Sequence, residues 1–268
     1  MRLGISSWTY AWAVGVPDRP PHRPLRPTDL LDRAAKLGVR VVQICDNLSL
    51  SALSPGELSE LERWAAALGI TIELGTRGTN RATLQGYLRL AERLKAPLLR
   101  LVPDSQTHHP SEDEIVATLR EIAPDLERAH VCLAIENHDR FKARTLARII
   151  ERIGSRAVGV CLDTANSFGS LEGPETVLDV LGPLAMNLHV KDFVVQRASH
   201  GMGFVIEGRP AGQGQLNIPW LLQALGDREI SAILELWTPP ESRLSATIAK
   251  EEAWAVSSIT YLRQLIPQ

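Results

Sequence analysis

At 268 residues, with 44% hydrophobic and 22% charged residues, the chain has the composition of a globular protein with a large buried core. Its formal net charge of −2 excludes the strongly basic surface that binds phosphate backbones, so no nucleic acid is expected as a partner. No segment reaches the roughly 18 apolar residues that span a bilayer, which predicts a cytoplasmic protein with no membrane partner.

Short runs rich in Val, Ile and Leu alternate along the chain with longer segments of helical periodicity. The runs predict eight strands at Leu3–Ser6, Val39–Ile44, Ile70–Leu74, Leu98–Val102, Val131–Glu136, Val158–Asp163, Ala185–Val190 and Ile230–Leu236. The clearest helical segments are Leu58–Leu68, Leu84–Leu94, Glu114–Arg128, Thr145–Ile153 and Ala246–Leu265. This alternation predicts one domain over residues 1–268, a single (β/α)₈ TIM barrel. An open doubly wound sheet is the alternative, but no glycine-rich phosphate loop follows the first strand.

Two connections leave the C-terminal ends of predicted strands and are unusual. Residues 17–27 contain five prolines, which predicts a stiff, extended loop. The long glycine-rich stretch Phe193–Gln215 is predicted to be a lid over the barrel mouth, the alternative being a surface insertion without function. The three cysteines, Cys45, Cys132 and Cys161, lie in or beside apolar runs and are predicted to be reduced core residues.

The last four strands are each predicted to end with a metal-competent side chain that points into the barrel. Alternate residues of a strand face opposite sides, and the large aliphatic residues of each strand share one parity. In the fifth strand, Leu133 and Ile135 take the outward face and leave Glu136 on the inward face. The same parity places three further side chains on the inner face: Asp163, His189 and Glu235.

Such a convergence has an electrostatic consequence. Three carboxylates in one low-dielectric cup repel one another and stay ionised only if a cation offsets them. Three oxygen ligands and one imidazole suit one divalent ion, with Mn²⁺ favoured and Mg²⁺, Co²⁺ or Zn²⁺ as alternatives. The predicted ligands are therefore Glu136, Asp163, His189 and Glu235. The alternative is four unrelated strand ends that are solvated or salt-bridged to Arg100, Arg197 or Lys191.

Four segments carry a family resemblance: Ala134–His138, Cys161–Thr164, Leu188–Asp192 and Leu234–Leu236. Together they resemble the xylose isomerase-like TIM barrel superfamily, in particular its sugar phosphate isomerase and epimerase branch, over nearly the whole chain. The resemblance implies the same four metal ligands, and that Glu136 and Glu235 also move protons. Ketose 3-epimerases of this type carry a histidine three residues after the aspartate ligand, where this chain has Asn166. Asparagine cannot relay a proton, although it can hydrogen-bond a substrate hydroxyl.

The predicted reaction is isomerisation or epimerisation of a ketose, inosose or keto-sugar derivative through an enediolate. A divalent ion that chelates a carbonyl and a neighbouring hydroxyl acidifies the adjacent carbon-bound proton. Glu136 and Glu235 are the predicted catalytic acid and base, on opposite sides of the substrate. Loss of a leaving group instead gives the alternative, a metal-dependent lyase or dehydratase acting on a similar keto-polyol.

Further residues are predicted to bind a small sugar or polyol substrate: Trp8, His138, Asn166, Lys191 and Arg197. Each has a structural alternative, such as core packing for Trp8 or pairing with Asp163 or Asp192 for Lys191. Arg209 lies in the same long connection as Arg197 and is a weaker candidate.

Two other classes of protein are alternatives to a sugar isomerase or lyase. An endonuclease IV-like repair enzyme would carry more histidine ligands and a basic DNA-binding face, which this sequence lacks. A non-catalytic sugar sensor would be expected to have lost part of the ligand set, which is complete here. A homo-oligomer is compatible with the sequence.

Overall fold

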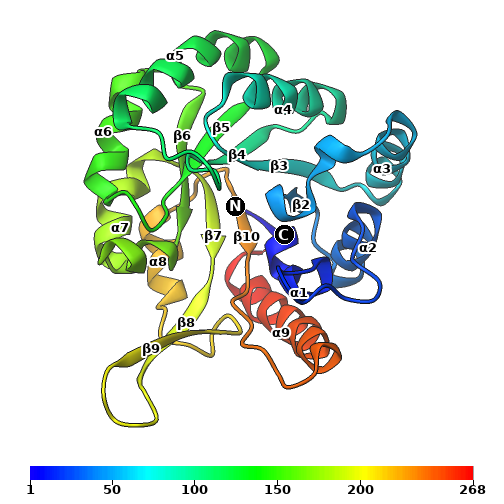
Figure 1. Ribbon diagram of the computed structural model, residues 1–268, viewed down its shortest axis with the longest axis vertical. Helices are drawn as coiled ribbons and strands as arrows, with labels where there is room; N and C mark the ends of the chain where they lie inside the picture. Colours follow the sequence, from blue (N-terminus) through cyan, green and yellow to red (C-terminus); the bar gives the residue numbers. More distant parts are fainter. Residues whose placement is uncertain (268) are drawn as a thin grey trace.

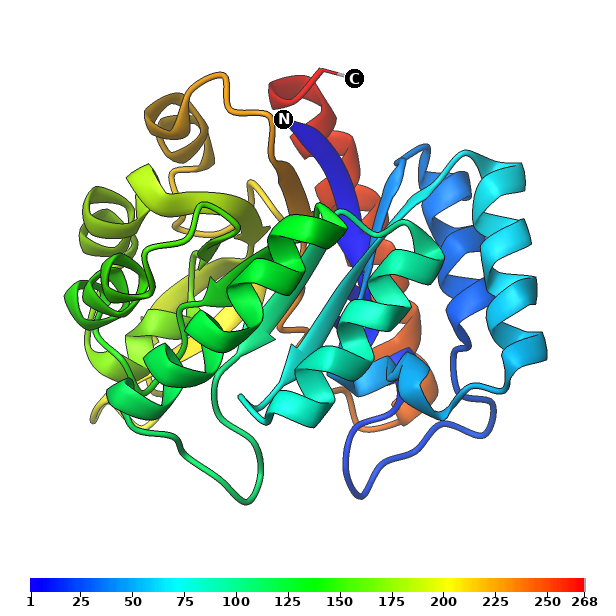
Figure 2. The same ribbon diagram turned by 90° about the horizontal axis from the view of Figure 1, so that it is seen from above.

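The computed structural model describes residues 1–267, in which eight parallel strands close into a barrel surrounded by helices (Figures 1 and 2). The barrel strands are β1 (Arg2–Ser6), β2 (Val41–Ile44), β3 (Thr71–Arg77), β4 (Leu98–Val102), β5 (Cys132–Glu136), β6 (Val158–Asp163), β7 (Ala185–Val190) and β10 (Ser231–Leu234). Neighbours follow chain order, and β1 pairs with both β2 and β10 to complete the circle. The predicted (β/α)₈ TIM barrel is confirmed.

Helices cover the outside of the barrel between successive strands (Figure 1). The α-helices are α1 (Ala11–Val14), α2 (Pro27–Leu37), α3 (Pro55–Leu68), α4 (Arg81–Leu94), α5 (Glu112–Ala129), α6 (Ala143–Ile153), α7 (Pro174–Leu181), α8 (Ile218–Leu225) and α9 (Leu244–Leu265). Short 3₁₀ helices lie at η1 (Ser7–Tyr10), η2 (Asp46–Leu48), η3 (Leu50–Ala52), η4 (Asn166–Ser170) and η5 (Gly182–Leu184). None of the helices within residues 1–267 combines the length and apolarity needed to cross a membrane.

Local sequence signals fix where several helices begin and end. The Ser54 hydroxyl accepts the Glu57 N–H while the Glu57 carboxylate accepts the Ser54 N–H, so the helix predicted from Leu58 begins at Pro55. At the other end, Gly69 adopts the left-handed conformation that terminates α3. These capping interactions set the length of the connections that lead back into the barrel.

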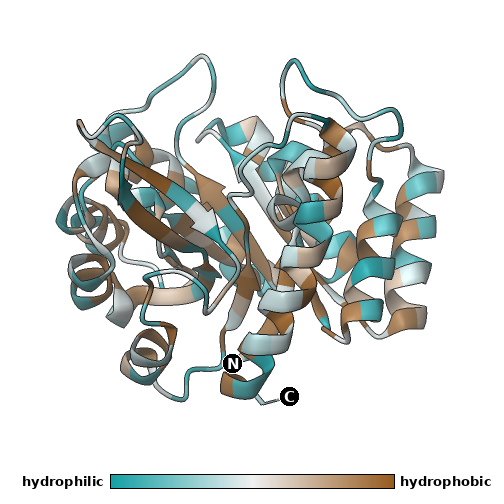
Figure 3. Ribbon diagram, turned by 90° about the horizontal axis from the view of Figure 1, so that it is seen from below, coloured by the Kyte–Doolittle hydropathy of each residue, from teal (hydrophilic) through white to brown (hydrophobic). Residues whose placement is uncertain are grey.

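The main core lies between the barrel and its helices, because the large aliphatic residues of each strand point outward. Leu133, Ile135, Val160, Leu162 and Leu188 all belong to this buried cluster. The barrel strands are largely brown in Figure 3, whereas the surrounding helices alternate between hydrophobic and hydrophilic residues. The opposite strand faces carry smaller or polar side chains, which leaves the barrel interior free for polar chemistry.

The connection after β7 differs from the open loop expected there. It forms an antiparallel hairpin of β8 (Asp192–Arg197) and β9 (Phe204–Arg209), which extends away from the barrel in Figure 1. The glycine-rich sequence indicated a loop, but the structure has two strands here that pair with each other and with no barrel strand. The last barrel strand is also shorter than predicted, since it ends at Leu234 and leaves Glu235 directly beyond it. The three cysteines are free thiols, two buried and Cys132 partly buried, as the sequence predicted.

Candidate metal centre

The structure brings the four predicted ligands together at the C-terminal mouth of the barrel. Glu136 and Asp163 end β5 and β6, His189 lies in β7 and Glu235 follows β10; all four are at most 2% exposed. The imidazole is at the centre of the group. Its Nδ1 lies 3.7 Å from Glu136 Oε2, 3.6 Å from Asp163 Oδ2 and 3.4 Å from Glu235 Oε1. One ligand atom each from Asp163, His189 and Glu235 lies within 4.8 Å of the others.

The atoms that face the centre of the group are donors that fit a metal ion, and the imidazole among them has no hydrogen bond at Nδ1. Glu136 Oε2, Asp163 Oδ2 and His189 Nδ1 are buried without a hydrogen bond of ordinary geometry within residues 1–267, although the first two form ion pairs with Arg100 and Lys191. Buried polar atoms without partners are rare, and an ion is one of the groups that satisfies them. The three oxygens and one nitrogen form the donor set expected for Mn²⁺ or Mg²⁺.

Cys161 also lies near this centre, with its sulfur within 4.8 Å of ligand atoms of Glu136 and His189. Burial raises the pKa of the Cys161 thiol to about 12, so without a metal the group is a neutral thiol near neutral pH. Its Sγ donates to Asn187 Oδ1 at 3.1 Å. Cys161 therefore lies beside the four predicted ligands as a hydrogen-bonded thiol.

Backbone and side-chain donors hold the carboxylates in place. Asp163 Oδ1 accepts the N–H groups of Ala165 and Asn166 at 2.9 and 2.8 Å, which turns Oδ2 toward the centre. Glu235 Oε1 accepts the Ser6 hydroxyl at 2.9 Å. The side chain of Asn166 bridges two groups, donating to Glu136 Oε1 at 2.5 Å and accepting from Lys191 Nζ at 3.2 Å. Each of the three carboxylates is thus oriented by a contact outside the set of predicted ligands.

Two buried cations pair with the acids. Lys191 Nζ lies 2.7 Å from Asp163 Oδ2 and 2.9 Å from Glu235 Oε2, and the Arg100 guanidinium forms an ion pair with Glu136. Arg100 also pairs with Asp46 at 2.9 Å. The salt bridges from Arg100 and Lys191 that the sequence offered as an alternative to a metal site are therefore present together with the convergent ligands.

These charges shift the titration of the buried groups. Burial raises the pKa of the Glu136 carboxyl, but the Arg100 guanidinium and His189 outweigh it and hold that pKa well below its usual value. Burial likewise raises and the Lys191 ammonium lowers the pKa of Asp163, with a net decrease. Burial lowers the pKa of Lys191, but the carboxylates of Asp163 and Glu235 raise it by more, so the net change is an increase. Both acids and the lysine are charged at neutral pH.

A cavity of about 120 Å³ opens above the ligands. Its lining residues are Trp8, Arg77, Arg100, Val102, Glu136, His138, Asn166, Lys191, Glu235, Leu236 and Trp237. Four of the five predicted substrate-binding residues line it, namely Trp8, His138, Asn166 and Lys191. Its small volume suits a compact polar molecule.

Arg197 is the predicted substrate-binding residue that the structure does not bring to the cavity. It lies on the exposed hairpin, where its guanidinium stacks on the Phe204 ring at 4.8 Å and donates to the Gly201 carbonyl at 3.2 Å. Arg209 is occupied in the same hairpin by Glu207 and by the Gly208 carbonyl. The hairpin carries these side chains away from the barrel mouth, and substrate binding by Arg197 stays a prediction.

The sequence predictions did not include Arg77 and Trp237 at the site, and they named Arg100 only as a salt-bridge partner in the alternative to a metal site. Arg77 and Arg100 have the inward parity of their strands, as the ligands do, and parity applied to the third and fourth strands would have found both. Trp237 lies beyond the last strand, and its ring is 5.5 Å from Lys191 Nζ. No periodic signal marks it.

Comparisons with known proteins agree with this architecture. Residues 31–265 match the family model described as xylose isomerase-like TIM barrel. The chain is 36% identical over 264 residues to a protein of Pectobacterium atrosepticum named 3-oxo-isoapionate decarboxylase, covering 98% of this chain and 95% of that relative.

Solved structures share the fold at low sequence identity. D-psicose 3-epimerase from Clostridium cellulolyticum H10, solved with D-tagatose, superimposes with a TM-score of 0.75 at 17% identity and 99% coverage of both chains. A barrel protein from Mycobacterium smegmatis, solved in complex with magnesium, superimposes with a TM-score of 0.67 at 15% identity and 97% coverage of both. With the fold, the family model and a relative of nearly full length in agreement, this chain belongs to the xylose isomerase-like TIM barrel family.

Proposed function

We propose that this chain is a lyase that uses one divalent metal ion to decarboxylate a 3-oxo acid derived from a sugar. Glu136, Asp163, His189 and Glu235 would hold the ion, for which Mn²⁺ is the preferred candidate. The relative named 3-oxo-isoapionate decarboxylase supports this substrate class, because the similarity extends over 98% of the chain. The predicted isomerase or epimerase reaction is the second candidate.

The observation that carries the proposal is that the acids of the site already have cationic partners. Arg100 pairs with Glu136, and Lys191 with Asp163 and Glu235. With Arg77 on the cavity wall, three positive side chains face four carboxylates, the fourth being Asp46, which gives these groups one net negative charge. A bound divalent ion then leaves the site with excess positive charge, which favours an anionic substrate over a neutral ketose.

The same pairs make proton abstraction from carbon difficult. Epimerisation requires a carboxylate base that accepts a proton, with a pKa matched to the task. The pKa of Glu136 is held well below its usual value, chiefly by Arg100 acting against burial, which makes Glu136 a weak base. Asn166, where ketose 3-epimerases carry a histidine, donates to Glu136 and adds no base. Decarboxylation needs no base at carbon.

The proposed reaction breaks the bond between the carboxylate carbon and its neighbour. The electron pair moves toward the 3-oxo oxygen, carbon dioxide leaves, and the resulting enolate takes a proton from water at carbon. A divalent ion supplies a Lewis acid that polarises the carbonyl when bound. Lys191, fixed between Asp163 and Glu235, adds a buried positive charge that stabilises the developing oxyanion.

Arg77 is the candidate partner of the substrate carboxylate. It lines the cavity, and no carboxylate of residues 1–267 forms an ion pair with it within 4.0 Å. A guanidinium binds a carboxylate through two parallel hydrogen bonds, which gives orientation as well as affinity. His138 lies at the same wall, with its Nδ1 2.6 Å from Asp139 Oδ1.

The deciding experiment offers Mn²⁺-loaded protein a panel of 3-oxo sugar acids and, separately, the neutral ketoses D-psicose, D-fructose and D-tagatose. Carbon dioxide release is measured together with the product by NMR in deuterated water. We expect the acids to release carbon dioxide. Their products should carry one solvent deuterium at the carbon from which carbon dioxide left. Epimerised ketose without carbon dioxide would assign the second candidate, and loss of water would assign a dehydratase.

A further inference from the structure

A layer of buried polar side chains lies inside the barrel directly below the ligands. It consists of Gln43, Glu73, Asn187 and Ser231, each at most 2% exposed. Polar groups so deep in a barrel are costly unless they are hydrogen-bonded to one another. The layer touches the candidate metal centre at one point, where Gln43 Oε1 lies 2.8 Å from His189 Nε2.

The orientation of the Asn187 amide is fixed by a backbone carbonyl. The Ser231 carbonyl oxygen can only accept a hydrogen bond, and it lies 3.3 Å from Asn187 Nδ2. The amide nitrogen must therefore face Ser231, whose hydroxyl oxygen lies 2.7 Å from it. Asn187 Oδ1 then faces the opposite way, toward Gln43, and also accepts from the Cys161 thiol.

The Gln43 amide is fixed in turn by two acceptors. Its Nε2 lies 3.1 Å from Asn187 Oδ1 and 3.2 Å from Glu73 Oε2. If the amide were reversed, the Gln43 side-chain oxygen would face Asn187 Oδ1 and Glu73 Oε2. Neither amide oxygen carries a proton, so Gln43 and Asn187 could then form no hydrogen bond. Gln43 Oε1 must therefore face His189, and an amide oxygen accepts only. His189 Nε2 carries the proton of this hydrogen bond, so in the neutral imidazole that binds a metal the lone pair lies on Nδ1.

We propose that Gln43 is a positioning residue that fixes the tautomer of His189, so that Nδ1 faces Glu136, Asp163 and Glu235 ready to bind the metal. The order of fixed groups runs from the Ser231 carbonyl through Asn187 and Gln43 to the imidazole. Glu73 holds the far side of the Gln43 amide, supported by the Ser231 hydroxyl at 2.6 Å. The inference rests on the metal site of the proposed function and is independent of the reaction catalysed there.

The test compares Gln43→Met with a matched control, Ser231→Ala. Each substitution removes one hydrogen bond to Glu73, but only Gln43→Met removes the bond to His189. Ser231→Ala keeps the backbone carbonyl that orients Asn187. Mn²⁺ affinity is measured by titration calorimetry of the full chain. We expect Gln43→Met to weaken it by about 10- to 100-fold, as loss of a contact that orients a metal ligand does, and Ser231→Ala to leave it close to the wild type.

A second readout follows the proton itself. In ¹⁵N-histidine-labelled protein with Mg²⁺, the wild type and Ser231→Ala should show a slowly exchanging His189 Nε2 proton that is lost in Gln43→Met. The His189→Ala variant assigns the signal. If Gln43→Met does not fold, Gln43→Asn withdraws the acceptor by one methylene and should weaken Mn²⁺ binding in the same direction. The assignment would be overturned if Gln43→Met kept both its Mn²⁺ affinity and the slowly exchanging His189 proton. It would also be overturned if Gln43→Met and Ser231→Ala lost Mn²⁺ affinity equally. Neither measurement uses a substrate, so failure to decarboxylate leaves this inference intact.

Discussion

The role of His189 as a ligand is tested by removing its imidazole from a site that keeps its three carboxylates. Its Nδ1 lies within 3.7 Å of an oxygen of each acid, so His189→Ala deletes the one neutral donor among three anions. We expect Mn²⁺ affinity to fall about 10-fold or more. The control is His138→Ala, which removes an imidazole from the same cavity but not from the ligand set. Full metal occupancy in His189→Ala would remove this residue from the site.

Arg77 gives a second prediction for a single residue, and it tests the anionic substrate. Arg77→Gln keeps a polar side chain but loses the charge and the two-pronged geometry, whereas Arg77→Lys keeps the charge alone. Because a hydrogen bond between charged groups contributes roughly 1.5–3 kcal/mol, we expect kcat/KM for a 3-oxo sugar acid to fall about 10- to 100-fold in Arg77→Gln. The decrease in kcat/KM should be smaller in Arg77→Lys. Steady-state kinetics that are equal in all three proteins would place the substrate carboxylate elsewhere.

Side-chain parity explains why the predicted metal ligands could be placed from the sequence. The alternation within β5 to β7 was enough to place Glu136, Asp163 and His189 on the inner face of the barrel. Their cationic partners could not be assigned in the same way. Which acid Arg100 meets depends on the register that sets it beside Ala134 of β5, and on side-chain rotamers. Contacts between strands far apart in sequence leave no trace in the periodicity of either strand.

Among the elements, the β8–β9 hairpin is the one that the sequence described least well. Two-stranded sheets are marginally stable alone, and this one is anchored only at its base. The Asp192 carboxylate accepts the backbone N–H groups of Phe193, Gly212, Gly214 and Leu216 at 2.8 to 3.1 Å. Toward the tip, Met202 and Phe204 are 76% and 65% exposed. No local pattern predicts such an anchor, because three of its four donors are backbone groups 20 to 24 residues after Asp192 in the sequence.

The hairpin is connected to the cavity wall, which leads to a prediction about its mobility. A side chain at Gly208 would collide with the backbone of Trp237, which lines the cavity, so β9 packs directly on that wall. We expect substrate to slow amide exchange in residues 194–209 while the Asp192 anchor stays protected in both states. Hydrogen exchange with and without a 3-oxo sugar acid measures this, with α4 and α5 as internal references. Identical exchange at saturation would make the hairpin a passive insertion.

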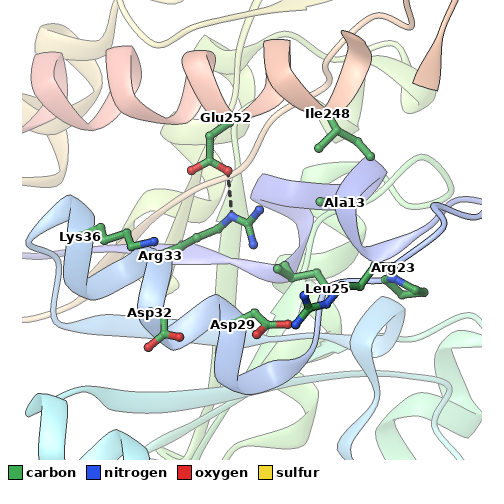
Figure 4. A pocket seen from close by; sticks show the side chains of 10 residues that line it. Ala13, Arg23, Leu25, Asp29, Asp32, Arg33, Lys36, Ile248 and Glu252 are labelled. Carbon is green, nitrogen blue, oxygen red and sulfur yellow. Dashed lines mark hydrogen bonds and ion pairs between the residues drawn. The ribbon is translucent and has the colours of Figure 1, made fainter. Parts of the chain in front are cut away.

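The barrel as a whole depends on contacts between the first and last parts of the chain. β1 pairs with β10, and α9 packs beside the segment that follows β1. A surface cleft of about 460 Å³ lies at this junction, where Arg33 of α2 pairs with Glu252 of α9 at 2.8 Å (Figure 4). One residue earlier, the buried Glu251 carboxylate accepts the N–H groups of Trp12 and Ala13 at 2.9 and 3.1 Å. The last helix thereby holds helix α1, which follows Trp8 of the cavity in the chain.

Glu251 makes the stability of this closure depend on pH. Burial raises its pKa from 4.5 to about 7, against the two backbone donors that lower it. Because the folded pKa lies above the unfolded one, the contribution of Glu251 to stability is complete below pH 4.5 and is lost as the pH rises through 7. Between pH 5 and pH 8 the loss amounts to roughly 2.5 kcal/mol, from 1.36 kcal/mol per pKa unit. Glutamine cannot ionise, so Glu251→Gln should not share this loss.

The measurement is urea unfolding of the wild type and of Glu251→Gln at pH 5 and at pH 8. Glutamine keeps one acceptor for two backbone donors, so the variant is expected to be less stable at pH 5. The deficit should shrink or reverse by pH 8, because only the wild type then carries a buried charge. At pH 8 Glu252→Gln changes the net charge as Glu251→Gln does, but it removes the Arg33 ion pair instead, so it controls for long-range charge effects there. A deficit of the same size at both pH values would mean that Glu251 keeps one charge state throughout, and α9 would then hold α1 equally well across this range.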